Sequence, residues 1–101
     1  MSERITKSML EKRIDYLNKV TGSPETPYTR RSDGKLYANI GNYHLDSAYG
    51  GYSIERMTNS AGGVSDLFEC GHQPIREIYN RLNAFIRGYD QAKREILEKV
   101  A

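Results

Sequence analysis

Apolar residues recur at helical spacing near both ends of the chain. The first stripe predicts a helix over about residues 7–20, which Gly22 ends. Thr6 is placed to cap its start, and Ser8-Met9-Leu10-Glu11 is a competing capping box two residues on. The second stripe predicts a helix over about residues 74–99, with Pro74 at its first position. The second stripe consists of Ile75, Ile78, Tyr79, Leu82, Phe85, Ile86, Tyr89, Ile96, Leu97 and Val100.

The predicted C-terminal helix is long for a chain of this size. About 25 residues at 1.5 Å each give roughly 38 Å of helix, whereas a compact domain of 100 residues has a radius of gyration of only about 13 Å. Ile96, Leu97 and Val100 therefore need a surface to pack on, and a second copy of the chain would supply it. The sequence predicts an obligate homo-oligomer.

The middle of the chain alternates polar and apolar residues between glycine-rich breaks. Residues 28–58 predict an antiparallel meander of two to four strands. Residues 59–71 predict a long glycine loop, which is typical of functional or mobile segments. We therefore expect one α+β domain over residues 1–101, with a helix, a small β-meander and a long helix in that order.

Composition narrows the class of protein. Hydrophobic residues make up 38% of the 101 residues and charged residues 28%, and no apolar run could cross a membrane. The charged start lacks the apolar core of a signal peptide, and the single Cys70 forms no internal disulfide, so we expect a cytoplasmic protein. The net charge of +2 makes a nucleic-acid partner less favoured than a small anion.

No enzyme signature is present in the sequence. Cys70 and His72 could supply only two metal ligands, so a small buried thiol beside a loop histidine is the better interpretation. His44 and Asp46 share a strand face, and we interpret them as a surface polar pair. The sequence predicts a protein that is not an enzyme and has no metal and no cofactor.

Three features could bind a nucleotide. The glycine loop includes Gly62, Gly63, Val64, Ser65 and Asp66, and its backbone N–H groups could cradle a phosphate or form an ordinary turn. Arg76 falls in the first turn of the long helix, where it could bind an anion or merely pair with Glu77. Tyr49 precedes Gly50-Gly51 and offers a ring on which a base could stack.

The order of these motifs resembles a known family. The run Ile40-Gly41-Asn42-Tyr43-His44-Leu45-Asp46-Ser47-Ala48-Tyr49-Gly50-Gly51-Tyr52 is followed by Arg56-Met57-Thr58-Asn59, Gly62-Gly63-Val64-Ser65-Asp66, Arg76-Glu77-Ile78-Tyr79 and Phe85-Ile86-Arg87-Gly88. This resembles small phage-encoded helix–sheet–helix proteins, and among them the type-1 Thoeris anti-defence family. Members of that family sequester cyclic ADP-ribose isomers, and some also bind cyclic oligonucleotides at a separate site of a hexamer.

The resemblance implies binding without turnover, in pockets at a dimer interface built from an aromatic residue, an asparagine and a helix arginine. By order and spacing those roles fall on Tyr49, Asn59 and Arg76. The expected ligand-binding residues are Tyr49, Arg56, Asn59, Gly62, Gly63, Val64, Ser65, Asp66 and Arg76.

The expected function is sequestration of a cyclic nucleotide immune signal in an infected bacterial cell. Three alternatives stay open at this point. The chain could be a phage structural or protein-interaction module, or a nucleotide hydrolase or lyase of unrecognised type. It could also be a small nucleic-acid binder that uses Arg30, Arg31, Arg87 and Arg94.

Overall fold

The computed structural model describes residues 4–100 and has the predicted α+β architecture. Two helices enclose the β region in sequence, and the strands form a two-stranded and a three-stranded antiparallel sheet. The elements in chain order are α1 (Lys7–Thr21), β1 (Tyr28–Arg30), β2 (Leu36–Ala38), β3 (Tyr43–Ala48), β4 (Gly51–Met57), β5 (Val64–Asp66) and α2 (Ile75–Val100).

The ends of α1 follow the predicted capping chemistry. The Thr6 hydroxyl accepts a hydrogen bond from the Met9 N–H at 3.1 Å, which satisfies one of the donors that a helix start leaves open. Gly22 follows the last residue of α1 in the left-handed conformation, with φ of 69°, and its N–H bonds to the Lys19 carbonyl. The predicted boundaries of this helix are confirmed to within one residue.

The start of α2 differs slightly from the prediction. The helix begins at Ile75, so Pro74 immediately precedes it and is not its first residue. The Pro74 carbonyl accepts the N–H groups of Glu77 and Ile78 at 3.0 and 3.2 Å. Pro74 therefore contributes an acceptor to the first turn.

The predicted loop over residues 59–71 is wrong in part, because it contains β5. This strand pairs with the last three residues of β4, from Glu55↔Asp66 to Met57↔Val64. The chain then continues along the same edge of β4, with the Leu67 N–H bonded to the Ile54 carbonyl and Gln73 bridged to Tyr52. The segment is ordered by the unpaired edge of β4, which needs hydrogen-bond partners along its length.

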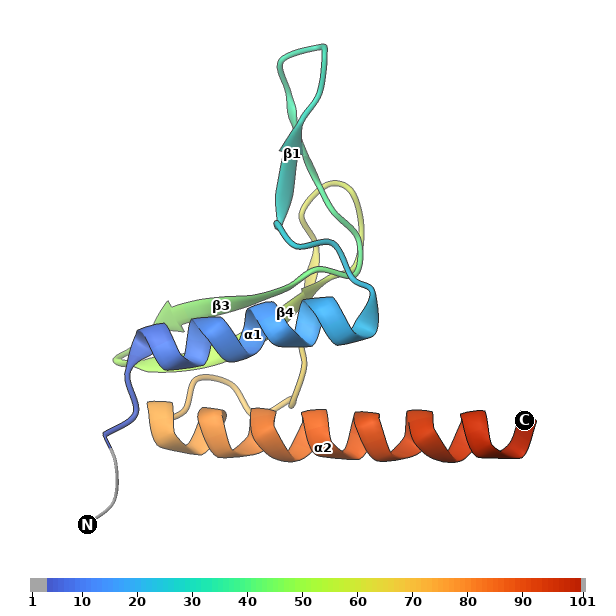
Figure 1. The fold of residues 1–101 in the computed structure, drawn as a ribbon. Coiled ribbons are helices and arrows are strands. Elements are labelled where there is room, and N and C mark those ends of the chain that lie inside the picture. The colour runs from blue at the N-terminus through green and yellow to red at the C-terminus, as the bar shows by residue number, and fades with distance from the viewer. Residues whose placement is uncertain (1–3, 101) are drawn as a thin grey trace.

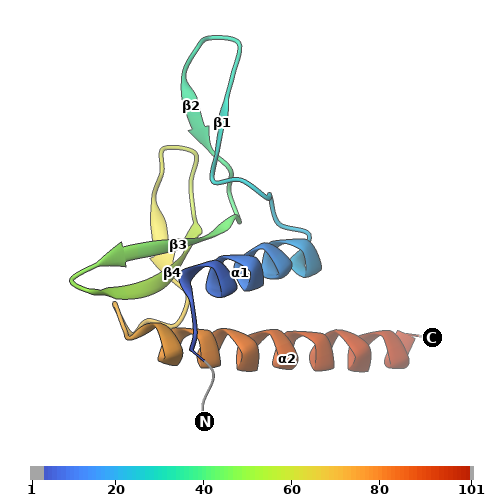
Figure 2. The same ribbon diagram turned by 60° about the vertical axis from the view of Figure 1, so that its left-hand side comes forward.

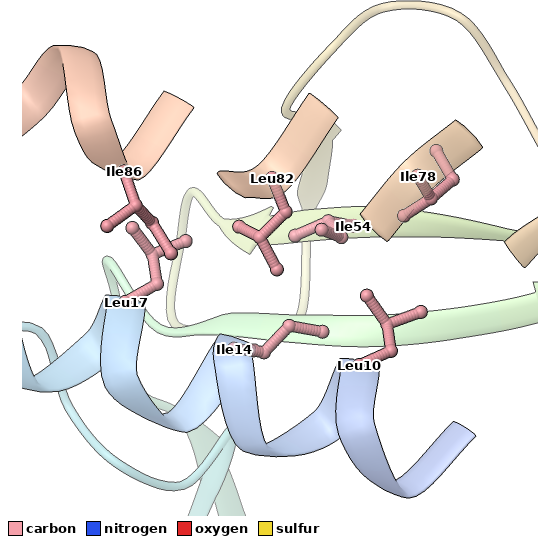
Figure 3. Close-up of a cluster of buried hydrophobic side chains, with 7 residues drawn as sticks. All are labelled: Leu10, Ile14, Leu17, Ile54, Ile78, Leu82 and Ile86. Atoms are coloured by element: carbon pink, nitrogen blue, oxygen red, sulfur yellow. The ribbon is translucent and has the colours of Figure 1, made fainter. Parts of the chain in front are cut away.

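Both helices lie side by side on one face of the β3–β4–β5 sheet (Figures 1 and 2). They run in the same direction, so their N-terminal ends lie at the same end of the molecule as the β3–β4 turn. Figure 3 shows the aliphatic side chains that fill the space between the helices and β4. These are Leu10, Ile14 and Leu17 of α1, Ile54 of β4, and Ile78, Leu82 and Ile86 of α2.

The second half of α2 extends beyond this core (Figure 1). All of residues 91–100 are exposed, and Ile96, Leu97 and Val100 retain 62%, 56% and 76% of their accessible surface. Charged residues are interspersed along α2, and no helix within residues 4–100 is long and apolar enough to cross a membrane. The apolar stripe thus continues past the part of the helix that the domain itself covers.

Candidate functional site

The glycine turn and Arg76 lie at opposite ends of β4. The glycine turn, which we define as residues 59–63, comes after the C-terminal end of β4. Arg76 lines a hollow together with Tyr52, which lies at the N-terminal end of β4. Seven extended residues span about 23 Å. The sequence places the two features close together, but the intervening chain runs back along the edge of β4. Within one protomer they do not form a common pocket.

Asn59 accepts hydrogen bonds from the backbone N–H groups of the glycine turn. Its side-chain oxygen accepts the N–H groups of Ala61 and Gly63 at 3.0 and 2.9 Å, and its backbone carbonyl accepts the N–H of Gly62 at 3.3 Å. A Cβ atom on Gly63 would lie 2.2 Å from the Asn59 side-chain nitrogen. The N–H groups that would cradle a phosphate are therefore used by the turn, and the close approach of Asn59 explains Gly63.

The residues after the glycine turn make structural contacts. Val64, Ser65 and Asp66 form β5, and the Asp66 carboxylate accepts the N–H groups of Phe68 and Gly71 at 3.1 and 2.8 Å. These bonds shape the chain before α2. They do not show that the three residues bind a ligand, so that role stays a prediction.

Arg56 also packs within the protomer. It stands opposite Tyr43 in the β3–β4 register, and its guanidinium lies over the Tyr43 ring, 5.7 Å from the centroid. A cation at this distance from an aromatic face is attracted by the ring. Arg56 is exposed on the C-terminal half of β4, away from Arg76, so its predicted ligand contact also stays a prediction.

Tyr49 is the most exposed large apolar residue, with 98% of its surface accessible. It occupies the β3–β4 turn with φ of 54°, followed by Gly50 with φ of 72°. Two successive positive φ values fit a tight hairpin turn, in which tyrosine is unusual and carries conformational strain. The β3–β4 turn lies at the end of the molecule where both helices begin (Figures 1 and 2).

A histidine–carboxylate pair lies behind Tyr49. The His72 Nε2 atom is 2.6 Å from the Asp46 carboxylate, and the rings of His72 and Tyr49 meet edge to face with centroids 5.8 Å apart. The predicted pairing of His44 with Asp46 is wrong, because His44 pairs with Glu55 at 3.3 Å, its neighbour across the strands. Only the strand register and the return of the chain along β4 could have indicated these pairs.

A basic hollow opens where the two helices begin. Its volume is about 530 Å³, and none of the lining residues within the described range 4–100 carries a carboxylate. Lys7 and Arg76 belong to the first turns of α1 and α2, where the unpaired N–H groups carry partial positive charge. The lining residues are Arg4, Ile5, Thr6, Lys7, Tyr52, Ile75 and Arg76. We call this feature the basic hollow. The sequence indicated Arg76 as a binding residue, but not Arg4 and Lys7, which lie about 70 positions earlier in the chain.

Glu77, the acidic residue next to Arg76 in α2, contacts a different arginine. Glu77 bonds to Arg81 one turn along the helix, at 2.7 Å. This contact raises the pKa of Arg81 above its ordinary value, because the carboxylate favours the charged guanidinium. Arg81 is therefore a cation that contacts Glu77 on the exposed face of α2. The alternative that Arg76 pairs with Glu77 stays a prediction.

A second hollow, between α1, β3 and residues 24–27, has the opposite character. Its volume is about 270 Å³, and three carboxylates line it, from Glu11, Asp15 and Glu25. These charges would repel a phosphate, and Lys7 is the one lysine among the described residues that line this hollow. Of the two hollows, the basic one suits an anionic ligand.

The described residues offer no group of three or more His, Cys, Asp or Glu side chains that could hold a metal ion. Cys70, predicted as a small buried thiol, is half-buried against the edge of the core. Comparisons with protein-family models, with curated proteins and with solved structures found no match. The resemblance to the Thoeris anti-defence family therefore stays a prediction.

The contacts of Asn59 lead to a test of its role. We expect Asn59→Ala to lower the free energy of unfolding by about 1 kcal/mol, because two turn N–H groups lose their acceptor. Urea unfolding measures this, with the exposed neighbour Ser60→Ala as a control that should change stability little. An unchanged stability together with weaker nucleotide binding would instead assign Asn59 to a ligand site.

Proposed function

We propose that the protein binds a small phosphate-bearing nucleotide without changing it, and that its role is to sequester a cyclic nucleotide signal such as a cyclic ADP-ribose isomer. The observation that carries the proposal is the basic hollow, which is lined by three cationic side chains and Tyr52 where the two helices begin. The resemblance of the sequence to the anti-defence family supplies the ligand class.

The charges of the hollow suit a pyrophosphate. Arg4, Lys7 and Arg76 supply three positive charges against the two negative charges of that group. Each helix start adds roughly half an elementary charge of the same sign. Arginine can also bind a phosphate through two parallel N–H···O bonds, which fixes its orientation. A phosphate here is favoured by long-range attraction and by directed hydrogen bonds.

Two tyrosines near the hollow could hold the rest of a nucleotide. Tyr52 lines the hollow, and the β3–β4 turn, which includes the exposed Tyr49, lies at the same end of the molecule as the starts of both helices (Figure 2). Stacking of a base on an aromatic ring contributes about 1–3 kcal/mol and tolerates different bases. The arrangement therefore favours a ligand that combines a phosphate with a planar base.

The lining of the hollow favours binding over catalysis. Its described lining residues include no histidine, cysteine or carboxylate. The Thr6 hydroxyl is engaged as the cap of α1, which leaves Lys7 and Tyr52 as the lining side chains with a group that could react. The His72–Asp46 pair is not among the lining residues. We expect a ligand held here to be released intact, as sequestration of a signal requires.

We propose further that copies of the chain associate through the second half of α2. Tyr89, Ala92, Ile96 and Leu97 line an apolar hollow of about 210 Å³ there, and the surrounding residues 91–100 are all exposed. Burial of apolar surface stabilises an interface by about 25 cal/mol per Å². A second copy would also be the source of the interface pockets that the family resemblance implies.

Arg76 is the residue that tests the nucleotide proposal most simply. We expect Arg76→Ala to weaken binding of a cyclic ADP-ribose isomer about ten- to a hundredfold, because a charge-assisted contact of about 1.5–3 kcal/mol is lost. Arg87→Ala removes the same side chain about three turns further along α2 and should leave the affinity unchanged. Titration calorimetry measures all three proteins.

The fate of the ligand separates sequestration from catalysis. After prolonged incubation and heat denaturation, the ligand should be recovered unchanged by chromatography. A converted product would contradict binding without turnover. Equal affinity of the wild type and both variants would show that the ligand does not use the basic hollow.

Association through α2 has its own test. Ile96→Asp should shift the protein towards the single-chain mass, since an unpaired carboxylate buried at an interface is costly. Asn80→Asp places a carboxylate on an exposed position of the first half of α2 and should not alter the mass. Light scattering at micromolar concentration measures both, and a wild-type protein that is already a single chain would contradict the proposal.

A further inference from the structure

The β1–β2 hairpin projects from the body of the molecule as a separate two-stranded ribbon (Figures 1 and 2). Tyr28 pairs with Ala38 at its base, and Arg30 with Leu36 nearer its tip. All three residues of β1 are exposed, and so is the turn over residues 31–35. We call residues 28–38 the ribbon. Of its residues only Ala38, at the base, is buried, and none belongs to the apolar cluster between the helices and β4, so stability of that cluster does not explain the length of the ribbon.

The ribbon carries the whole formal net charge of the chain. It holds Arg30, Arg31 and Lys35 against one acidic residue, Asp33, which gives 3 − 1 = +2. The full sequence has 15 basic and 13 acidic residues, so the remaining residues number 12 of each and sum to zero. The net charge of +2 is therefore concentrated on the ribbon, while the basic and acidic residues of the remaining chain are equal in number.

Contacts within the ribbon hold its cations in place. The Arg31 guanidinium stacks over the Tyr37 ring, 4.3 Å from the centroid, and Arg30 donates a hydrogen bond to the Gly34 carbonyl. Such contacts reduce the conformational freedom that an arginine loses when it binds. Two of the three cations at the tip are thus partly ordered before any partner arrives.

The one acidic residue of the ribbon is occupied by the turn. The Asp33 carboxylate accepts the Tyr37 hydroxyl at 2.6 Å and the Lys35 N–H at 2.9 Å. The hydrogen bond from Tyr37 holds the pKa of Asp33 below its ordinary value. Asp33 therefore stabilises the turn in its charged form. Its carboxylate is the one negative charge of the ribbon, against the three positive charges of Arg30, Arg31 and Lys35.

We infer that the ribbon is a contact element for the sugar–phosphate backbone of double-stranded DNA. A two-stranded β-ribbon has the width that the major groove of B-DNA admits. Ordered arginines and a lysine on such a ribbon match the regular negative charge of that groove's phosphate walls. The inference does not depend on the proposed nucleotide site, because the ribbon and the basic hollow share no residue.

The test uses a fluorescent 20-base-pair duplex and anisotropy at two salt concentrations. Three phosphate contacts at about 0.9 each predict a slope of about −2.7, so affinity should fall about 40-fold between 50 and 200 mM salt. In Arg31→Ala/Lys35→Ala one contact remains, and the fall should be only about three- to fourfold. Lys12→Ala removes one exposed charge from α1 and should reproduce the wild-type slope.

A variant of opposite sign checks that charge on the ribbon is responsible. Asp33→Asn keeps one oxygen that can accept the Lys35 N–H, places an amide N–H donor where the second oxygen met the Tyr37 hydroxyl, and removes the negative charge, so DNA affinity at 50 mM salt should rise. Circular dichroism should be the same for every variant, because none of the altered residues belongs to the core.

Three results would overturn the inference. The first is no binding to the duplex at 50 mM salt, and the second is a salt slope unaffected by the double substitution. The third is equally tight, ribbon-dependent binding of polyglutamate or of anionic lipid vesicles, which would assign the ribbon to an acidic protein or to a membrane surface.

Discussion

The packing of α1 and α2 around Ile54 is the constraint on which the remaining structure depends. Side chains from both helices meet those of β4 in one aliphatic cluster (Figure 3). Full burial of each such side chain contributes about 1.5–3 kcal/mol, whereas charge at a helix end contributes about 0.3–1 kcal/mol. Apolar packing therefore outweighs the repulsion between two parallel helix dipoles. As a result, the partial positive charges of both helix N-termini lie at the same end of the molecule. A bound anion there would lower their mutual repulsion.

Asn18 ties this packing to the sheet. Only 1% of the surface of Asn18 is exposed. Its side-chain N–H donates to the Tyr43 carbonyl at 2.9 Å, and its side-chain oxygen accepts the Tyr43 N–H at 2.8 Å. A buried amide must have partners, and here they are the backbone groups at the start of β3. The end of α1 is thereby fixed to the sheet, which in turn positions its beginning beside α2.

Helix boundaries could be predicted from the sequence because they depend on local chemistry. The apolar period, the Thr6 cap and Gly22 act within a few residues of one another, and the structure confirms them. The strand β5 could not be predicted in this way, because three residues carry little periodicity and their pairing depends on the free edge of β4.

The candidate site was only partly predictable for the same reason. Arg76 was found because its place in the first turn of a helix is a local feature. Arg4 and Lys7 join it only when α1 packs beside α2, which no local pattern indicates. The glycine turn was placed near Arg76 on sequence proximity alone, and the extended course of the chain along β4 separates them.

Nuclear magnetic resonance of the ¹⁵N-labelled protein tests the central claim most directly. On titration with a cyclic ADP-ribose isomer, the account predicts that the largest amide shifts fall in the first turns of α1 and α2 and at Tyr52. Shifts confined to the turn over residues 59–63, or no shifts at millimolar ligand, would contradict a phosphate site where the two helices begin.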